Sequence, residues 1–163
     1  INEQIADELM KTGFKNVVLM GDHGGGQAQL RSVAAKLDAK YAGQGIRVVY
    51  CDEVYGKANG DFDKEITAQG YPASAHAGIP DTSEMLYLGG DKGWVRKELV
   101  KDALGDPMPV PGAKPDRVAP RVNNGITGDG RRSSAELGKK LFDMKTAYAV
   151  TQIRRLLGAS NAH

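Results

Sequence analysis

The sequence predicts an α/β protein with parallel strands, and two observations support this fold class. The first is a short apolar run at residues 17–20, which ends in a glycine-rich turn and leads into a segment with helical spacing. The second is a further strand pattern at residues 46–52, which follows that helix. A helical crossover between two such strands makes them parallel neighbours with a right-handed connection. Both strands are therefore expected to end at the same edge of a sheet.

Apolar spacing and glycine positions predict the helices and strands of the first part of the chain. Residues 3–12 have the apolar spacing of a helix, which Gly13 ends, and residues 16–20 form a short strand, apolar from residue 17 on, of the kind buried in a parallel sheet. In the helix after the glycine-rich turn, apolar residues recur at intervals of three and four positions. The glycines at residues 43–45 end that helix before the second strand begins.

The middle of the chain is less regular. Residues 54–72 are polar with weak helical spacing, and residues 70–80 are expected to form a loop. Thr82 or Ser83 can cap the helix that follows, because a hydroxyl oxygen accepts a hydrogen bond from the first free N–H groups of a helix. This region therefore predicts a loop and one capped helix.

The last part of the chain combines a long turn-rich segment with a helix. Residues 105–130 are rich in proline and glycine and predict neither a strand nor a helix, and loops of this length usually wrap a site or a neighbouring subunit. Ser133 or Ser134 is expected to begin the final helix, which runs to Leu157 before Gly158 ends it.

Composition limits the class of protein. The chain has 163 residues, 40% of them hydrophobic, which suits one folded domain with a core. It carries 22 Lys and Arg against 20 Asp and Glu, and because these basic residues are scattered, a nucleic-acid partner is not indicated. No segment approaches the roughly 20 apolar residues of a membrane span. We therefore expect a soluble protein with no membrane partner, and a cytoplasmic location rather than export.

Three single residues, Cys51, Trp94 and His163, add to this picture. The one cysteine, Cys51, cannot form an intrachain disulfide, and its place beside an apolar strand favours a buried thiol. The one tryptophan, Trp94, either lines a pocket or packs against Tyr87 and Leu88, and packing is the favoured interpretation. The last histidine, His163, is expected to have no role.

The glycine-rich turn at residues 21–26 lies where α/β enzymes place their chemistry, at the carboxyl end of a strand. A neutral imidazole such as His23 suits zinc or another divalent metal, and Gly24 and Gly25 let a substrate approach the backbone closely. Asp22 is a candidate for orienting the imidazole ring or contacting substrate. The alternative for His23 is a turn histidine bonded to its own loop.

Other interpretations of this turn are weaker. A dinucleotide-binding loop requires glycine at its third position, which His23 occupies, and no Gly-Lys-Ser or Gly-Lys-Thr follows to make a phosphate-binding loop. The run His-Gly-Gly-Gly matches the oxyanion-hole string of lipase-like esterases. However, the sequence contains no Gly-x-Ser-x-Gly motif to supply their nucleophile, so a serine hydrolase is not favoured.

A second candidate site surrounds His76, in a loop of small residues that leaves its ring accessible. An accessible imidazole can transfer protons near neutral pH, and the alternative is an ordinary surface histidine. Gly78 is a candidate substrate contact in the same loop. Asp81 either ligates a metal or caps the following helix, and capping is the commoner use of an aspartate in that position.

Three motifs taken together resemble those of the creatininase (creatinine amidohydrolase) family. They are Gly-Asp-His-Gly-Gly at residues 21–25, Ala-His-Ala-Gly-x-x-Asp-Thr-Ser at residues 75–83, and Gly-Ile-Thr-Gly-Asp at residues 125–129. They occur in the family's order and cover nearly all of the chain. The resemblance implies a Rossmann-like three-layer α/β/α fold with a mainly parallel sheet, and a homo-oligomer, often a hexamer. It also implies hydrolysis of C–N amide bonds with two divalent metal ions, commonly zinc, manganese or iron.

The resemblance also implies roles for particular residues. His23 takes the place of the family's metal-binding histidine, and His76 that of the histidine that contacts substrate and shuttles protons. Asp81 takes the place of an acidic residue, usually glutamate, near the metals. The chain departs from the family at Gly26, where many members have asparagine, and at Ile79, where many have an acid. It also lacks the Glu-x-His pair and the bridging aspartate that members carry in an earlier segment.

The function implied for the complete protein is a metal-dependent amidohydrolase acting on a small, in some members cyclic, amide through a metal-activated water. Because these 163 residues supply His23 and at most Asp81 as clear ligands, the isolated chain is expected to bind metal poorly and to be inactive. It would then form a single domain, residues 1–163, in the C-terminal portion of a longer protein. The alternative is a non-catalytic binding or assembly module of the same fold that has lost its metals.

Overall fold

The computed structural model describes residues 1–108 and 121–158, which form two compact units. The first unit comprises Ile1–Ala58 together with the chain from Lys145 onward, and the second comprises Asn59–Met144. His163 and the central part of the proline-rich segment lie outside the described residues. The expectation of one domain over the whole chain stays a prediction.

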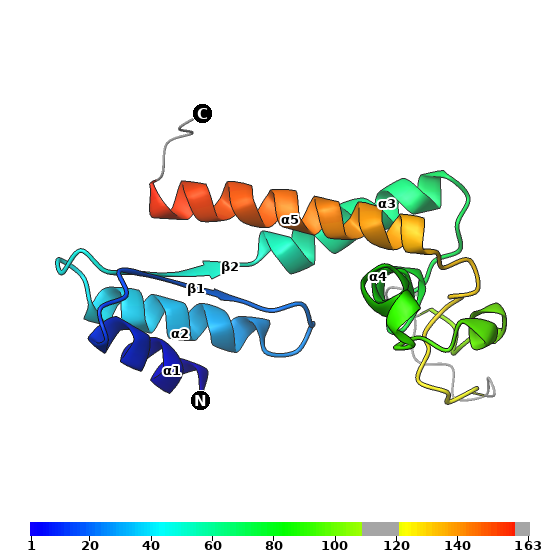
Figure 1. Ribbon diagram of the computed structural model, residues 1–163, viewed down its shortest axis with the longest axis horizontal. Coiled ribbons are helices and arrows are strands. Elements are labelled where there is room, and N and C mark those ends of the chain that lie inside the picture. Colours follow the sequence, from blue (N-terminus) through cyan, green and yellow to red (C-terminus); the bar gives the residue numbers. More distant parts are fainter. Residues whose placement is uncertain (109–120, 159–163) are drawn as a thin grey trace. The chain divides into compact units, whose positions relative to one another are not determined.

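The first unit contains the predicted alternation of helix and strand (Figure 1). Its elements in chain order are α1 (Asn2–Lys11), β1 (Asn16–Met20), α2 (Gln27–Lys40) and β2 (Arg47–Cys51). The strands pair in parallel, with Val18 opposite Val49 and Met20 opposite Cys51, so both end at one edge. The α/β class and the parallel pair are therefore confirmed. Among the described residues this sheet has two strands, so the three-layer Rossmann-like arrangement stays a prediction.

Helices cover both faces of this strand pair. Helices α1 and α2 lie along one face and enclose a core that includes Met10, Leu37 and Val48 (Figure 1). On the other face, the C-terminal half of α5 (Ala135–Leu157) approaches the strands, and Gln152 accepts a hydrogen bond from the backbone N–H of Glu53 at 2.8 Å. The expectation of a buried thiol is confirmed, because Cys51 is 0% exposed and burial raises the pKa of its thiol.

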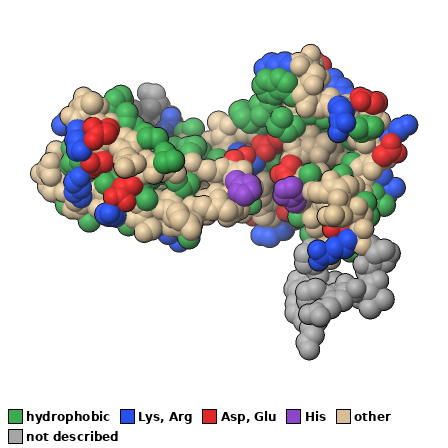
Figure 2. All heavy atoms as spheres, turned by 90° about the horizontal axis from the view of Figure 1, so that it is seen from below, with side chains coloured by type: hydrophobic (Ala, Val, Ile, Leu, Met, Phe, Trp, Pro, Cys, Tyr) green, Lys and Arg blue, Asp and Glu red, His purple; other side chains and the backbone are tan. Residues whose placement is uncertain are grey.

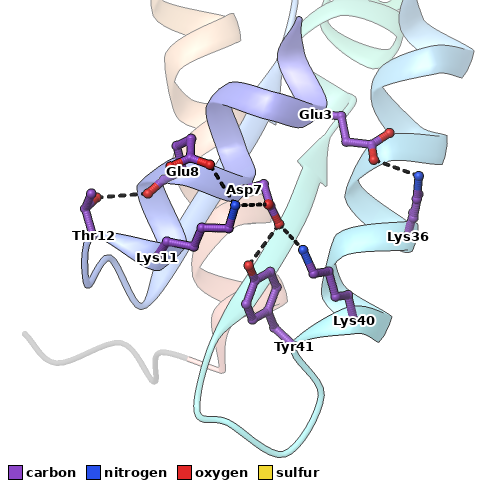
Figure 3. Close-up of polar contacts among 8 residues, drawn as sticks. All are labelled: Glu3, Asp7, Glu8, Lys11, Thr12, Lys36, Lys40 and Tyr41. Carbon is purple, nitrogen blue, oxygen red and sulfur yellow. Dashed lines mark hydrogen bonds and ion pairs between the residues drawn. The ribbon is translucent and has the colours of Figure 1, made fainter.

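A polar network joins α1 to α2 around Asp7 (Figure 3). The carboxylate of Asp7 binds the ammonium group of Lys40 at 2.5 Å and that of Lys11 at 2.9 Å, and accepts a hydrogen bond from the hydroxyl of Tyr41 at 2.9 Å. These contacts hold the pKa of Asp7 far below its usual range, with Lys40 making the largest contribution. The ionised carboxylate therefore helps to fix α1 on α2.

We expect the substitution Asp7→Asn to flatten the acid limb of the stability profile. A carboxylate whose pKa is lowered on folding stabilises the fold above its unfolded pKa of about 3.9 and loses that contribution as the pH falls through its folded pKa. The melting temperature, measured between about pH 2 and pH 6, should therefore change less with pH in the variant. Asp91→Asn, at a fully exposed carboxylate, is the control. Equal slopes in both variants and the unmodified chain would contradict the expectation.

The second unit is mostly helical. A π-helical turn, Glu53–Lys57, ends the first unit and leads into α3 (Ala58–Ala68), where the sequence predicted only weak helical spacing. Helix α4 (Ile79–Gly89) follows, and after it come two short 3-10 helices, Gly90–Lys92 and Lys97–Asp102. The core of this unit consists of buried side chains from α3, α4 and the first part of α5, namely Phe62, Ile66, Ile79 and Leu141.

The predicted cap of α4 at Thr82 or Ser83 is wrong. The helix begins at Ile79, with Gly78 as its N-cap residue, because Pro80 fits the first turn of a helix and the Ile79 N–H is satisfied by the Ser74 hydroxyl at 2.8 Å. The predicted start of the last helix is confirmed at Ser134, whose hydroxyl accepts a hydrogen bond from the N–H of Leu137 at 3.2 Å.

The described parts of the proline-rich segment form no strand but make isolated β-bridges. Gly128 pairs with Ser74 in the loop before α4, whereas Asp129 pairs with Leu104 and Thr127 with Asp106, both after α4. Within residues 1–108 and 121–158, no helix combines the length and apolar character needed to cross a bilayer.

Candidate functional site

The glycine-rich turn follows β1 at the carboxyl edge of the strand pair and is held by Gln27, the first residue of α2. The Gln27 side-chain amide donates hydrogen bonds to the carbonyl oxygens of Gly21 at 2.9 Å and His23 at 2.5 Å. The amide oxygen accepts a hydrogen bond from the hydroxyl of Tyr50 on β2. Gln27 therefore fixes the turn to the neighbouring strand. The sequence offered no signal for this role, because a glutamine in the first turn of a helix is commonplace.

Backbone conformation explains the residue at the end of this turn. Gly26 has a φ of +91°, in the left-handed region that glycine adopts readily and that asparagine tolerates better than other residues. The asparagine that the family resemblance implies here would tolerate the same conformation, so glycine preserves the backbone at this position. The departure at Gly26 is therefore weak support for a loss of function.

His23 is exposed and bonds to its own turn. Its Nδ1 atom accepts a hydrogen bond from the N–H of Gly25 at 3.0 Å, so the neutral ring carries its proton on Nε2. A Cβ atom at residue 25 would lie 3.2 Å from this ring, so a larger residue there would require the ring to shift by a few tenths of an ångström. His23 therefore has the geometry of a turn histidine bonded to its own loop. Metal binding at Nδ1 would require the Gly25 N–H to be displaced.

Asp22 is fixed by α5. Both carboxylate oxygens of Asp22 accept hydrogen bonds from the ammonium group of Lys145, at 2.9 and 2.8 Å, and Lys145 is only 6% exposed. The buried cation therefore directs the Asp22 carboxylate toward α5. The expected contact between Asp22 and the ring of His23 or a substrate stays a prediction.

Beside the turn, a pocket of about 440 Å³ opens at the carboxyl ends of the two strands. Two acids at this edge, Asp52 and Glu53, line the pocket, but each is paired: Asp52 with Arg31 at 2.9 Å and Glu53 with Arg155 at 2.7 Å. Gly24 lies against Tyr55, since a Cβ atom at residue 24 would sit 2.9 Å from the tyrosine hydroxyl. The carboxylates at this edge are therefore held in ion pairs and are not free to ligate a metal.

In the second unit, a backbone carbonyl orients the ring of His76. Its Nδ1 atom lies 2.6 Å from the carbonyl oxygen of Gly125, and a carbonyl can only accept, so Nδ1 carries a proton. In the neutral ring, Nε2 is then unprotonated and can accept a proton. Backbone hydrogen bonds from Ala75 N–H to Thr127 O and from Thr127 N–H to His76 O, both 2.9 Å, hold the two segments together. The second and third sequence motifs therefore meet at His76.

The residues after His76 form a tight, strained turn. Ala77 has a φ of +51°, which is unfavourable for a residue with a side chain, and two groups of α4 stabilise it. The Asp81 carboxylate accepts a hydrogen bond from the Ala77 N–H at 2.8 Å, and the Thr82 hydroxyl donates to the Ala77 carbonyl at 3.0 Å. Asp81 thus satisfies the turn before the helix rather than the helix N-terminus.

Two further groups lie around this turn. Gly78 is buried, and a Cβ atom there would sit 2.5 Å from the Cβ of Ser74, so packing alone requires glycine at this position. A substrate contact by Gly78 stays a prediction. Asp63 on α3 is a carboxyl group that sequence reasoning missed. Burial and the nearby charge of Asp81 raise its pKa above the usual range.

A pocket of about 650 Å³ adjoins the His76 turn, and Trp94 forms part of its wall. The indole ring also packs on Gly89, where a Cβ atom would lie 2.1 Å from the ring. The pocket-lining interpretation of Trp94 is therefore the one that the structure supports, although packing was favoured from the sequence.

The candidate metal-ligating side chains of this chain do not form a two-metal centre by themselves. Histidine side chains are exposed on the face drawn in Figure 2. Within the part of the chain that is described, however, no three His, Cys, Asp or Glu side chains lie close enough together to hold a metal ion. The candidate donors are also engaged: His23 by Gly25, Asp22 by Lys145, and Asp81 by Ala77. A two-metal hydrolytic centre needs more ligands than these residues provide.

Comparison with known proteins gives a family and a structural relative. The model of the creatininase family, described as creatinine amidohydrolase, matches residues 1–153. A crystal structure from Bacteroides fragilis NCTC 9343, provisionally assigned as a creatinine amidohydrolase, is similar with a TM-score of 0.59 at 17% sequence identity. The likeness covers 99% of this chain but 61% of that one, so the present chain spans less than two thirds of its relative. No curated protein matches the sequence.

Proposed function

Because this chain belongs to the creatininase family, we propose that the whole protein is a metal-dependent amidohydrolase that cleaves a C–N amide bond of a small, in some substrates cyclic, amide. The observation that best supports the proposal is the geometry of His76. Its ring is exposed, its Nδ1–H group is held by the Gly125 carbonyl, and its Nε2 atom can take up a proton. Such an imidazole suits a general acid and base that works near neutral pH.

In this proposal, His76 accepts and donates the proton that moves during hydrolysis. Its Nε2 atom accepts a proton as water adds to the amide carbonyl, and then delivers that proton to the departing nitrogen. The ring must not rotate between these two steps. The Gly125 carbonyl and the turn stabilised by Asp81 and Thr82 provide that restraint.

Metal dependence is proposed for the whole protein and not for these 163 residues alone. Two divalent ions, zinc, manganese or iron, would polarise the amide and lower the pKa of a bound water. His23 and Asp81 are the proposed ligands from this chain, and the other ligands would come from residues outside it. Asp22, Gly24, Gly25 and Gly78 are the proposed substrate contacts, and a homo-oligomer, possibly of six copies in keeping with the family, is the proposed assembly.

The test compares the whole protein with the 163-residue chain. Hydrolysis is measured as ammonia released from formamide, as the ring-opened amino acid from small lactams and as creatine from creatinine, before and after chelation and after addition of zinc or manganese. We expect hydrolysis by the whole protein that chelation abolishes and metal restores, and none by the 163-residue chain. Tight binding of two ions to the 163-residue chain in calorimetry would overturn the ligand assignment.

A second candidate function is a non-catalytic binding or assembly module of the same family. It is favoured by the engagement of His23, Asp22 and Asp81 in hydrogen bonds within the chain. Metal analysis of the whole protein distinguishes the two candidates. A protein purified without metal that hydrolyses none of the amides would support the module and contradict the enzyme.

A further inference from the structure

The pocket beside the His76 turn shares its walls with the groups that hold His76. Ala77 and Asp81 line it on one side, and they belong to the turn that follows the histidine. Asn124 and Ile126 line it on another, and they flank Gly125, whose carbonyl binds the imidazole at 2.6 Å. A molecule in this pocket would therefore lie next to the His76 turn and to the backbone that orients the ring.

The remaining walls are mainly apolar and include a fixed aromatic ring. Met85, Leu99 and Val100 contribute aliphatic surface, and Trp94 contributes its indole. The indole packs on Gly89, where there is no room for a side chain, and the backbone N–H of Trp94 donates to the Gly89 carbonyl at 3.2 Å. Trp94 nevertheless remains 60% exposed. A ring that is anchored and still accessible offers a flat surface for an apolar group.

Size and charge limit what this pocket can accept. Its volume of about 650 Å³ lies within the range of about 300–1,000 Å³ that is typical of small-molecule sites. A simple amide without a large substituent would leave much of it unfilled. The charged lining consists of two carboxylates, Asp81 and Asp102, and one guanidinium group, Arg96. The ammonium group of Lys92 lies 4.7 Å from the centre of the Trp94 ring. The charges beside the pocket therefore nearly balance, which favours an uncharged ligand.

We propose that this pocket is a substrate subsite that takes an uncharged aromatic or bulky aliphatic group attached to the scissile amide. The inference rests on the proposed amidohydrolase function and narrows its substrate class. Substrates would be amides with a large apolar substituent, which packs against Trp94 and Leu99 while the amide bond faces the His76 turn. Small polar amides would lack this contact.

The fluorescence of Trp94 provides a direct test, because it is the only tryptophan in the 163 residues. The chain is titrated with phenylacetamide, with acetamide as the same amide without the ring, and with phenylacetate as the anionic analogue. We expect a saturable change in emission with phenylacetamide, none with acetamide, and binding of phenylacetate that is several-fold weaker. Equal responses to phenylacetamide and acetamide would overturn the subsite.

Two variants test whether the change in Trp94 emission arises from binding in this pocket. Ala103→Leu places extra side-chain volume into the wall and should abolish the response, whereas Ala147→Leu, at an exposed position of α5, is the matched control. If circular dichroism shows that Ala103→Leu is unfolded, Leu99→Asp serves instead. Leu99 is 44% exposed, and a charge there should remove the apolar contact without burying the new carboxylate. An unchanged response in a folded pocket variant would overturn the proposal.

The subsite and the proposed function can fail separately. If Trp94 responds to phenylacetamide but the whole protein hydrolyses no amide, the pocket is a binding site and the proposed function is wrong. If the whole protein hydrolyses small amides and Trp94 does not respond to the aromatic one, the function stands and the subsite is wrong.

Discussion

Replacing His76 with alanine in the whole protein is expected to lower the rate of amide hydrolysis by about 10²- to 10⁴-fold, the usual contribution of a general acid and base. The reason is the ring geometry: Nδ1–H is held by the Gly125 carbonyl, which leaves Nε2 to accept and return a proton. The His76 side chain is exposed, so its removal should leave the melting temperature nearly unchanged. Initial rates and thermal melts of the purified proteins measure both effects.

A conservative variant separates proton transfer from positioning. His76→Gln keeps an N–H group that can reach the Gly125 carbonyl but removes the titrating ring, so it should lose as much activity as His76→Ala. His23→Ala should lower metal content as well as the rate, whereas the His76 variants should retain their metal. Normal turnover in His76→Ala, or full recovery in His76→Gln, would show that this histidine does not transfer the proton.

The largest effect on stability is expected from Gly138→Ala, where α5 crosses α4. A Cβ atom at residue 138 would lie 1.9 Å from the carbonyl oxygen of Ser83 and 2.4 Å from its carbonyl carbon. These are backbone atoms within a helix, so neither can move without displacing α4. Ser83 is fully buried, and its hydroxyl accepts a hydrogen bond from the Ser134 N–H at 3.2 Å, which fixes the crossing further.

Overpacking of this kind typically costs about 1–3 kcal/mol, occasionally more, and contact with backbone places this variant at the upper end. The free energy of unfolding, measured in urea, should fall by that amount. Gly60→Ala on α3 is the matched control, because a Cβ atom there meets nothing within 4 Å. It should be neutral or stabilising by up to about 1 kcal/mol, since alanine restricts the unfolded chain. Equal stability of the two variants would contradict the close crossing.

The sequence predicts the first unit well because periodicity and glycine placement determine local structure there. The strand predicted at residues 16–20 coincides with β1, and Gly158, with a φ of +69°, follows the last helix as expected. The start of α4 was wrong because the hydroxyls of Thr82 and Ser83 gave a cap signal. The actual start depends on Ser74, which lies in the preceding loop and is bonded to the Ile79 N–H.

The candidate site is harder to predict because its contacts connect distant residues. Lys145 binds Asp22 across 123 positions of sequence, and a lysine in an amphipathic helix is most often solvated. The partner of His76 is a backbone carbonyl, at Gly125, and any residue could supply such an atom. Motif resemblance located both histidines, but it could not show that His23 bonds to its own turn.

The left-handed backbone of Ala77 affects how the neighbouring histidine is presented. A residue with a Cβ atom pays about 1–2 kcal/mol for this conformation, and glycine would not. Glycine would also give the segment many more accessible shapes. The folded protein therefore accepts a small energetic penalty at residue 77 and gains preorganisation, because an imidazole carried on a stiff loop needs less reordering when a ligand arrives.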